Sequence, residues 1–241
     1  MLSKKEVKDI QSLALKKHRD ETKLFIAEGP KIVEELINLH PGQLKAVFAL
    51  REWEGRPKVK GNIRFEEITD VELEKLSFLK TPNQVVALVK QFENTAPQTA
   101  GLLLYLDNIQ DPGNMGTIIR TADWFGVSQI VCSAGCVDMY NPKVVQATMG
   151  SIARVKVYYD EDESWLGAQT IPVYAASLHG NNLDEMPAVS EGIILIGNES
   201  KGIRKEWLEL AKEKITIPKK GNAESLNAAV ATGIILSRLI K

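Results

Sequence analysis

Short apolar runs in the second half of the chain alternate with stretches of helical periodicity, and this alternation constrains the fold more than any other feature of the sequence. The strand-like runs are Leu102–Leu106, Ile130–Cys132, Val155–Tyr158, Val173–Ala176, Ile193–Ile196 and Ile215–Ile217. Strands that alternate with helices are joined as parallel neighbours, and the helices cover both faces of the sheet. The sequence therefore predicts an α/β domain with a mostly parallel sheet over residues 101–241.

A polar segment divides the chain in two. Residues 91–100 carry Pro97 and show no apolar periodicity, which is typical of a linker. Before this segment we expect a small α/β domain over residues 1–90. Its predicted strands are Leu24–Ala27, Ala46–Leu50, Ile63–Ile68 and Val85–Val89, and its predicted helices lie near Val7–Ala14, Ile32–Ile37 and Val71–Phe78, the last opened by Thr69 or Asp70.

Composition excludes several protein classes. With 44% hydrophobic and 25% charged residues over 241 positions, the chain has the composition of a folded globular protein. No apolar run approaches the ~20 residues that cross a bilayer, and the N-terminus lacks the apolar stretch of a secretory signal, so we expect a cytoplasmic protein without a membrane partner. Only Cys132 and Cys136 are present, and this spacing without a nearby His fits neither a disulfide framework nor a zinc site. No metal is expected.

The net charge of −1 gives no general attraction to nucleic acid, so an RNA partner would have to be met by a local basic patch. Lys16, Lys17, His18 and Arg19 run together and are one candidate for phosphate contact. A solvated helix end is the commoner explanation of such a run, and both readings stay open here.

The most informative segment is Asp107–Arg120, which follows an apolar strand and leads into an apolar-periodic helix that ends near Phe125. Ligands of open α/β sheets bind beyond the carboxyl ends of strands. Asn108, Asp111 and Asn114 place polar side chains there, and we expect Arg120 about one and a half turns into the helix. Helix capping is the alternative explanation, although it accounts for one such Asn more easily than for three polar groups.

Two further segments repeat the order of strand, polar loop and helix. Ile193–Ile196 runs into Gly197-Asn198-Glu199 and Gly202, and Ile217-Pro218 is followed by Ser225-Leu226-Asn227 and a helix rich in small residues up to Gly233. Capping again explains Ser225 and Asn227 as single residues. A Gly inside a helix costs ~1 kcal/mol relative to Ala, so we expect Gly233 to mark close packing against another backbone, with the helix at an interface.

Together these segments resemble the three motifs of SpoU-type (TrmH-like) RNA ribose 2′-O-methyltransferases of the SPOUT class. The matching residues are Asn114-x-Gly116-x-x-x-Arg120, Gly197-Asn198-Glu199-x-x-Gly202, and Ile217-Pro218 followed by Ser225-Leu226-Asn227. Residues 1–90 resemble the family's ribosomal-protein-like substrate-binding domain, in Phe25-Ile-Ala-Glu28-Gly29 and Val85-Val-Ala87.

The resemblance implies a methyltransferase that uses S-adenosylmethionine, binds RNA and acts as a homodimer, with a deep trefoil knot in its C-terminal domain. It implies catalytic roles for Arg120, Asn114, Glu199, Ser225 and Asn227, and a donor site at Gly197, Ile217 and Leu226. The exposed candidates Trp124 and Phe125 and the small-residue helix agree with a dimer, although core packing explains them too.

The chain departs from the family pattern in two places. Ala229 stands where members often have a Ser, and Lys219-Lys220 replaces a residue that is frequently apolar, which favours RNA phosphate near the donor. The family places the Arg at the substrate hydroxyl as a proposed base. Because a guanidinium normally keeps its proton, we favour an orienting and charge-stabilising role for Arg120 and keep the base role as the alternative.

The sequence is compatible with three functions. We favour methylation of a ribose 2′-hydroxyl in ribosomal RNA, because the chain carries a distinct N-terminal domain of ~90 residues. The alternatives are a tRNA ribose 2′-O-methyltransferase and a non-catalytic RNA-binding factor for ribosome assembly. The last should have lost Arg120 or the Glu199 loop, and both are present.

Overall fold

The computed structural model describes residues 2–56 and 63–240, and several of its helices begin at side chains that cap them. Ser3, Asp111 and Asn141 each accept a backbone N–H of the helix that follows them, and Thr69 forms a reciprocal capping box with Glu72. Such caps satisfy amides that have no partner inside a helix. The helix expected to open at Thr69 or Asp70 is confirmed, with Thr69 as its cap.

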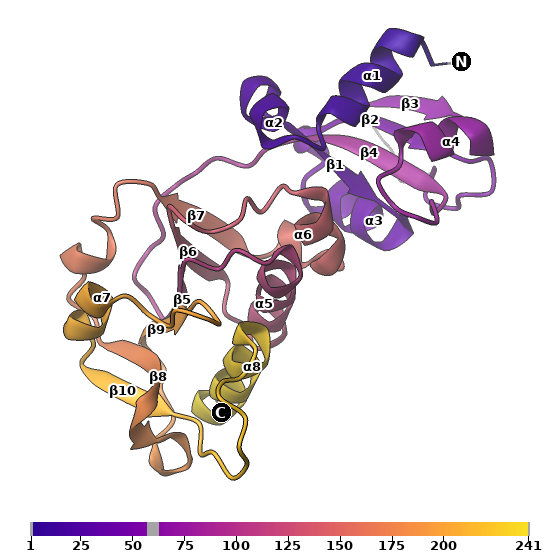
Figure 1. Ribbon diagram of the computed structural model, residues 1–241. Helices are drawn as coiled ribbons and strands as arrows, with labels where there is room; N and C mark the ends of the chain where they lie inside the picture. The colour runs from indigo at the N-terminus through magenta and orange to yellow at the C-terminus, as the bar shows by residue number, and fades with distance from the viewer. Residues whose placement is uncertain (1, 57–62, 241) are drawn as a thin grey trace. The chain divides into compact units, whose positions relative to one another are not determined.

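The helices and strands follow one another as Figure 1 shows. The helices are α1 (Lys4–Ser12), α2 (Lys16–Thr22), α3 (Pro30–Leu39), α4 (Asp70–Leu76), α5 (Pro112–Trp124), α6 (Pro142–Ala147), α7 (Lys205–Leu210) and α8 (Ala228–Leu239). The strands are β1 (Leu24–Glu28), β2 (Leu44–Ala49), β3 (Arg64–Glu67), β4 (Val85–Lys90), β5 (Leu102–Asp107), β6 (Gln129–Ser133), β7 (Lys156–Asp160), β8 (Val173–Asn182), β9 (Gly192–Gly197) and β10 (Glu213–Thr216).

The N-terminal unit has a mixed sheet. Over the described residues its strands lie in the order β1-β4-β2-β3, with β4 antiparallel to both neighbours and β2 parallel to β3. Residues of α1 and α4 pack in one hydrophobic cluster against this sheet, and α3 contacts β1 and β4. Glu28, at the end of β1, is buried and accepts the backbone N–H of Phe78 and the hydroxyl of Ser77, which ties the chain after α4 to the sheet.

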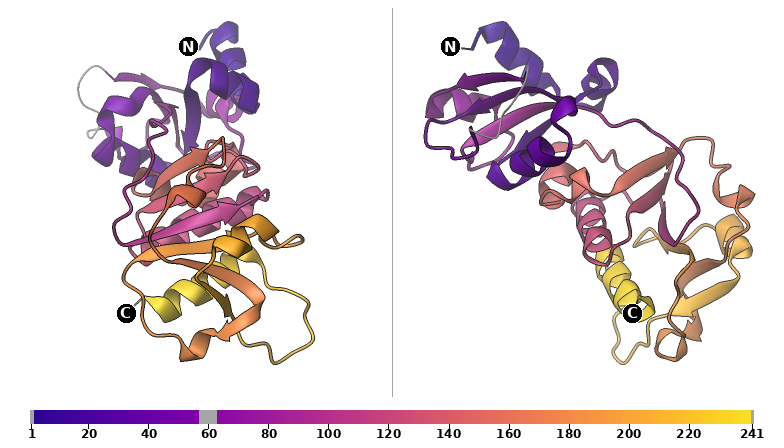
Figure 2. Two further views of the ribbon diagram at one scale, coloured as in Figure 1. Left: turned by 90° about the vertical axis from the view of Figure 1, so that its left-hand side faces the viewer. Right: turned by 180° about the vertical axis from the view of Figure 1, so that it is seen from behind.

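The C-terminal unit has an all-parallel sheet in the order β10-β8-β9-β5-β6-β7, in agreement with the expected mostly parallel sheet. Helices cover both faces. On one face Trp207 of α7 packs in a cluster with Tyr105 and Leu195. On the other, α5 and α8 pack against each other (Figure 2), and α8 contacts β9.

The two compact units do not follow a single cut of the sequence. One comprises Met1–Glu93 and Asp138–Arg154, and the other Asn94–Val137 and Val155–Lys241. Residues 138–154 join the first unit because α6 packs against β1 and the ring of Tyr140 lies 4.8 Å from that of Phe25, centroid to centroid. The chain passes between the two units three times, and the linker expected at residues 91–100 lies near the first of these points. No sequence signal marked the other two, which lie before Asp138 and after Arg154.

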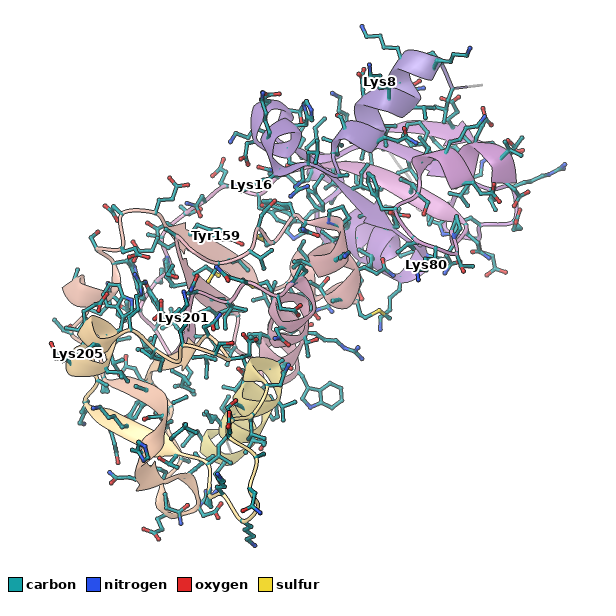
Figure 3. All side chains as sticks on the ribbon, in the orientation of Figure 1. Lys8, Lys16, Lys80, Tyr159, Lys201 and Lys205 are labelled. Carbon is teal, nitrogen blue, oxygen red and sulfur yellow. The ribbon has the colours of Figure 1, made fainter. Side chains whose placement is uncertain are left out.

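The basic run that is one candidate for phosphate contact forms α2, and its arginine is not available. Arg19 is 2% exposed and donates to the carbonyl oxygens of Leu13 and Ala14 and to Asp138. Lys16, labelled in Figure 3, pairs with Asp20 at 2.8 Å across one helical turn. Arg19 is therefore excluded as a phosphate contact, because the largely buried Asp138 carboxylate and two carbonyls already take its donors.

Within this chain no backbone approaches Gly233 closely, and the expected packing against a second copy stays a prediction. A methyl group at this position of α8 would meet Cγ2 of Thr121 at 3.8 Å, which is an ordinary contact. The neighbouring small residues Ala228 and Ala229 are buried within the subunit. Core packing thus accounts for much of the small-residue face.

In the described part of the chain, no helix has the length and apolar character needed to cross a bilayer.

Arg19→Met tests the buried ion pair that joins α2 to residues 138–154. The change removes the cation from Asp138, which among the described residues keeps only the backbone N–H of Tyr140, and takes the Arg19 donors from two carbonyls. We therefore expect a loss of about 3–5 kcal/mol in the free energy of unfolding. Urea unfolding followed by circular dichroism measures this loss. Lys16→Met is the control. Because Lys16 lies on the surface, we expect the unfolding free energy to change by no more than about 0.5 kcal/mol. Equal losses of unfolding free energy in the two variants would show that the pair of Arg19 with Asp138 does not stabilise the fold.

Candidate functional site

The candidate site lies where β5, β9 and β10 end and the chain continues toward α5, α7 and α8. Strands β5 and β9 are direct neighbours, and Asp107 lies opposite Gly197 in their parallel register. Because parallel strands end at the same edge of a sheet, the polar segments after β5 and β9 leave it side by side.

Helix α5 begins earlier than expected. Asp111 accepts the backbone N–H of Asn114 at 2.8 Å and caps the helix, so Pro112 to Gly116 form its first turns and not a loop. The capping interpretation is therefore right for Asp111. Asn114, in the first turn, keeps its side-chain amide for other partners.

A chain of side-chain hydrogen bonds links the three sequence motifs. The Nδ2 of Asn227 donates to Oδ1 of Asn114 at 2.7 Å, and Nδ2 of Asn114 donates to Oε1 of Glu199. Oδ1 of Asn227 at the same time caps α8 by accepting from the amides of Ala229 and Val230. Asn227 is thus both a cap and a site residue, because its two amide ends bond in different directions.

The loop after β9 is closed on itself. Asn198 and Gly202 form an antiparallel pair, with the N–H of each donating to the carbonyl of the other at 3.1 and 2.8 Å. The side chain of Asn198 donates to the carbonyl of Asn108 at 2.9 Å. A methyl group on Gly197 would lie 2.4 Å from the carbonyl carbon of Gly202. Only glycine fits this position, because the two strands of the loop approach so closely.

A cavity of about 950 Å³ opens beside this loop. Its lining includes the three residues expected to hold the donor, Gly197, Ile217 and Leu226. Two of the expected catalytic residues, Glu199 and Ser225, line it as well. Ser225 is exposed on the lining. Ile196 and Ile235 add apolar surface from β9 and α8.

The cavity wall carries charges of both signs. Lys201, Lys219 and Lys220 line it together with His179, and Glu199 and Glu224 provide carboxylates. The three lysines are exposed, and they come from two loops that are separated in sequence. Such a site is suited to a ligand with both cationic and anionic groups.

Arg120 stands apart from this constellation. It is exposed on α5 and belongs neither to the cavity lining nor to the chain of hydrogen bonds. Because α5 begins at Pro112, Arg120 lies roughly 2.5 turns after the cap rather than one and a half. It is about 120° from Asn114 around the helix axis, so the two side chains leave α5 in different directions.

Sequence reasoning missed a buried carboxylate and its partner. Asp107 is fully buried at the end of β5 and pairs with Arg204, which directly follows the β9 loop. An aspartate at the end of an otherwise apolar strand is a signal that could have pointed to this pair, since buried carboxylates need a partner.

The two cysteines lie on β6 and just after it. Cys136 Sγ donates to the carbonyl of Leu106 at 3.2 Å and accepts the amide of Ile109, and burial raises the pKa of the Cys132 thiol. Within the described residues, no three His, Cys, Asp or Glu side chains are grouped so as to hold a metal ion.

Comparison with known proteins covers both halves of the chain. Residues 101–237 match the model of the SpoU rRNA Methylase family, and residues 4–87 match that of an MRM3-like substrate binding domain. The 23S rRNA (guanosine(2553)-2′-O)-methyltransferase RlmP of Bacillus subtilis is 32% identical, over 97% of this chain and 95% of that protein.

Solved structures agree along the same length. A protein from Porphyromonas gingivalis described as belonging to the TrmH family of RNA methyltransferases superposes with a TM-score of 0.90 and 33% identity, covering 99% of this chain and 98% of its own. An AdoMet-bound rRNA methyltransferase from Sinorhizobium meliloti superposes with a TM-score of 0.85 and 32% identity, covering 99% and 96%.

Gly197→Ala tests the closed geometry of the β9 loop. The added methyl group forces the loop open, and we expect a loss of about 1–3 kcal/mol in the free energy of unfolding, as for other overpacked sites. Gly221→Ala, on the same cavity wall but with no atom within 4 Å of the added methyl, is the matched control and should leave stability nearly unchanged. Calorimetric melting of both variants decides, and similar melting temperatures would show that the loop is not constrained at Gly197.

Proposed function

The chain belongs to the SpoU rRNA methylase family, and we propose that it transfers a methyl group from S-adenosylmethionine to the 2′-hydroxyl of a ribose in ribosomal RNA. The observation that carries this proposal is the chain of hydrogen bonds from Asn227 through Asn114 to Glu199, which joins all three motif segments beside one cavity. RlmP and the Sinorhizobium enzyme, both named as rRNA methyltransferases, match nearly the whole chain, including the N-terminal unit.

The cavity fits the proposed donor. Ile217 and Leu226 offer apolar surface for an adenine ring, and the backbone of Gly197 is open to the cavity. Glu199 and Glu224 supply negative charge for a cationic ligand, and the lysines suit its carboxylate. When bound, S-adenosylmethionine supplies an electrophilic methyl group on a sulfonium, so the protein's work is to hold and orient the reactants.

The polar side chains of the site have distinct proposed roles. Asn227 and Glu199 fix the amide of Asn114 from its two ends, which leaves one orientation for this side chain. Ser225, exposed on the cavity lining, is placed to hydrogen-bond a ligand. These four residues arrange the site, and the proton that the 2′-hydroxyl loses on methylation is released to solvent.

Arg120 supplies positive charge outside the cavity. An arginine guanidinium stays protonated in proteins, so it suits an RNA phosphate or a developing alkoxide better than the role of a proton acceptor. Its exposed position on α5 supports an encounter with a large substrate rather than with the donor.

Assembly and topology follow from family membership as further proposals. We propose that residues 1–90 bind the RNA through a ribosomal-protein-like domain, that residues 101–241 form the methyltransferase domain with a deep trefoil knot, and that two copies form a homodimer. The exposed Trp124 on α5 (85%) and Val230 on α8 (51%) support a second copy on this helical layer. A cytoplasmic location stays a prediction.

Transfer of labelled methyl from S-adenosylmethionine to RNA tests the function. Unmodified large-subunit rRNA should accept label at a linkage that resists alkali and nuclease, as a 2′-O-methylated ribose does, whereas tRNA transcripts should not. Label on tRNA alone would show that the substrate is tRNA and not rRNA. Absence of transfer to any RNA would favour a binding factor without turnover.

Arg120→Ala should nearly abolish methyl transfer while the affinity for S-adenosylmethionine, measured by calorimetric titration, changes little, because the donor cavity does not include Arg120. Arg120→Lys should remain poor, since a point charge does not replace a planar fork. Lys212→Ala, an exposed cation of the same unit outside the cavity, is the control. Loss of donor affinity in step with activity would make Arg120 a structural residue.

Lys219→Gln combined with Lys220→Gln tests phosphate contact beside the donor. Each lost contact removes about 0.7–0.9 from the slope of log affinity against log salt, so RNA binding should become less salt-dependent by about 1.5. Lys156→Gln with Lys212→Gln, two exposed lysines outside the cavity, should leave the slope unchanged. Filter binding at several salt concentrations measures the slope for the wild type and for both double variants. If the Lys219→Gln, Lys220→Gln variant has the same slope as the wild type, the phosphate contact is excluded.

A further inference from the structure

Arg204 lies at the exit of the loop that the proposed donor site uses. Loop 197–203 is closed at its neck by the Asn198–Gly202 pair, and Ile203 is buried in the core behind it. Arg204 is the next residue and precedes α7 (Lys205–Leu210). Any displacement of Arg204 therefore pulls directly on the loop.

Arg204 is held from both its backbone and its side chain. Its amide donates to Oδ2 of Asp107 and its Nε to Oδ1, each at 2.8 Å. Its two terminal nitrogens donate to the carboxylate of Glu163, at 2.6 and 2.9 Å. The guanidinium carbon lies 5.1 Å from the ring centre of Trp207. One arginine thus connects the ends of β5 and β9 to the loop after β7.

The burial of these groups makes the arrangement rigid. Asp107 has no exposed side-chain surface, and Arg204 is 35% exposed. A buried carboxylate without its cation is strongly unfavourable, so Asp107 holds Arg204 in place. Arg204 in turn lowers the pKa of Glu163 through the two hydrogen bonds it donates. Bidentate pairs of this kind fix direction as well as distance.

We propose that Arg204, anchored by Asp107 and Glu163, is a positioning residue that holds loop 197–203 in its binding shape before S-adenosylmethionine arrives. The inference rests on the proposed function in one respect, namely that Gly197 and Glu199 face the donor. Arg204 touches neither reactant. It acts by removing the ordering cost that the donor would otherwise meet on binding.

This role predicts a division between binding and turnover. Without the clamp of Asp107, Arg204 and Glu163, the donor has to order the loop itself, which weakens affinity. Once the donor is bound at saturation, the loop has the same shape, so kcat stays close to the wild-type value. A loss of fold would instead lower the amount of active enzyme and leave the KM for the donor unchanged.

The experiment compares full-length variants that weaken the clamp by steps. Glu163→Gln keeps the pair of Asp107 with Arg204 and removes one charge, Arg204→Lys keeps the charge without the fork, and Arg204→Met removes both. Asp107→Asn with Arg204→Met avoids an unpaired buried carboxylate if the single variant does not fold. Lys205→Met is the matched control, because Lys205 (labelled in Figure 3) is the adjacent cation and is 89% exposed.

Three readouts are measured on each variant, and the third is kcat at saturating donor. Hydrogen–deuterium exchange without donor reports the opening of loop 197–203, and calorimetric titration with S-adenosylmethionine reports affinity. We expect exchange in this loop to accelerate and donor affinity to fall about tenfold for Arg204→Met, the scale of one hydrogen bond to a charged group. Glu163→Gln and Arg204→Lys should be intermediate, and kcat at saturating donor should stay within about twofold, as expected when only ground-state binding is lost.

The other outcomes overturn the inference. Unchanged exchange in Arg204→Met and in the double variant would show that the loop keeps its shape without the clamp. Faster exchange with unaltered affinity would show that the shape does not serve the donor. A wild-type chain that binds no donor would contradict the proposed function, and the exchange rates alone would then decide whether Arg204 holds the loop.

Discussion

The parallel pairing of β5 with β9 is the constraint on which the rest of the site depends. This pairing sets Asp107 opposite Gly197, so that two polar segments more than eighty residues apart in sequence leave the sheet as neighbours. Both strands are buried on their two faces, as expected for neighbours in a parallel sheet covered by helices. The hydrogen bond of Asn198 to the Asn108 carbonyl and the pairing of Arg204 with Asp107 both follow from this alignment.

Polar groups at this edge of the sheet serve two purposes at once. Asp111 and Asn227 cap helices, and the same caps direct Asn114 and Asn227 toward each other. A capping residue has a fixed backbone and a restricted rotamer, which suits it to hold a second group in place. The choice between a structural and a functional role for these residues is therefore not exclusive, since stability of the helix ends and geometry of the site are obtained from the same side chains.

The two units differ in how their charges are used. In the N-terminal unit the basic run of α2 is largely neutralised by its own acidic neighbours and by Asp138, so its density in the sequence overstates its availability. In the C-terminal unit Lys219 and Lys220 are exposed on the wall of the cavity. Burial and pairing, rather than the number of cations in a run, decide which of them can meet a phosphate.

The sequence by itself determined the α/β class, most strand positions and the three motif segments, because apolar periodicity and turn residues are local signals. It also identified the family, since the motif residues stand in order. Tertiary structure alone decided that residues 138–154 pack with the N-terminal unit, that Arg19 is buried, and that Asp107 and Arg204 meet. These outcomes depend on pairings between distant segments, and no local pattern encodes which distant partner satisfies a buried charge.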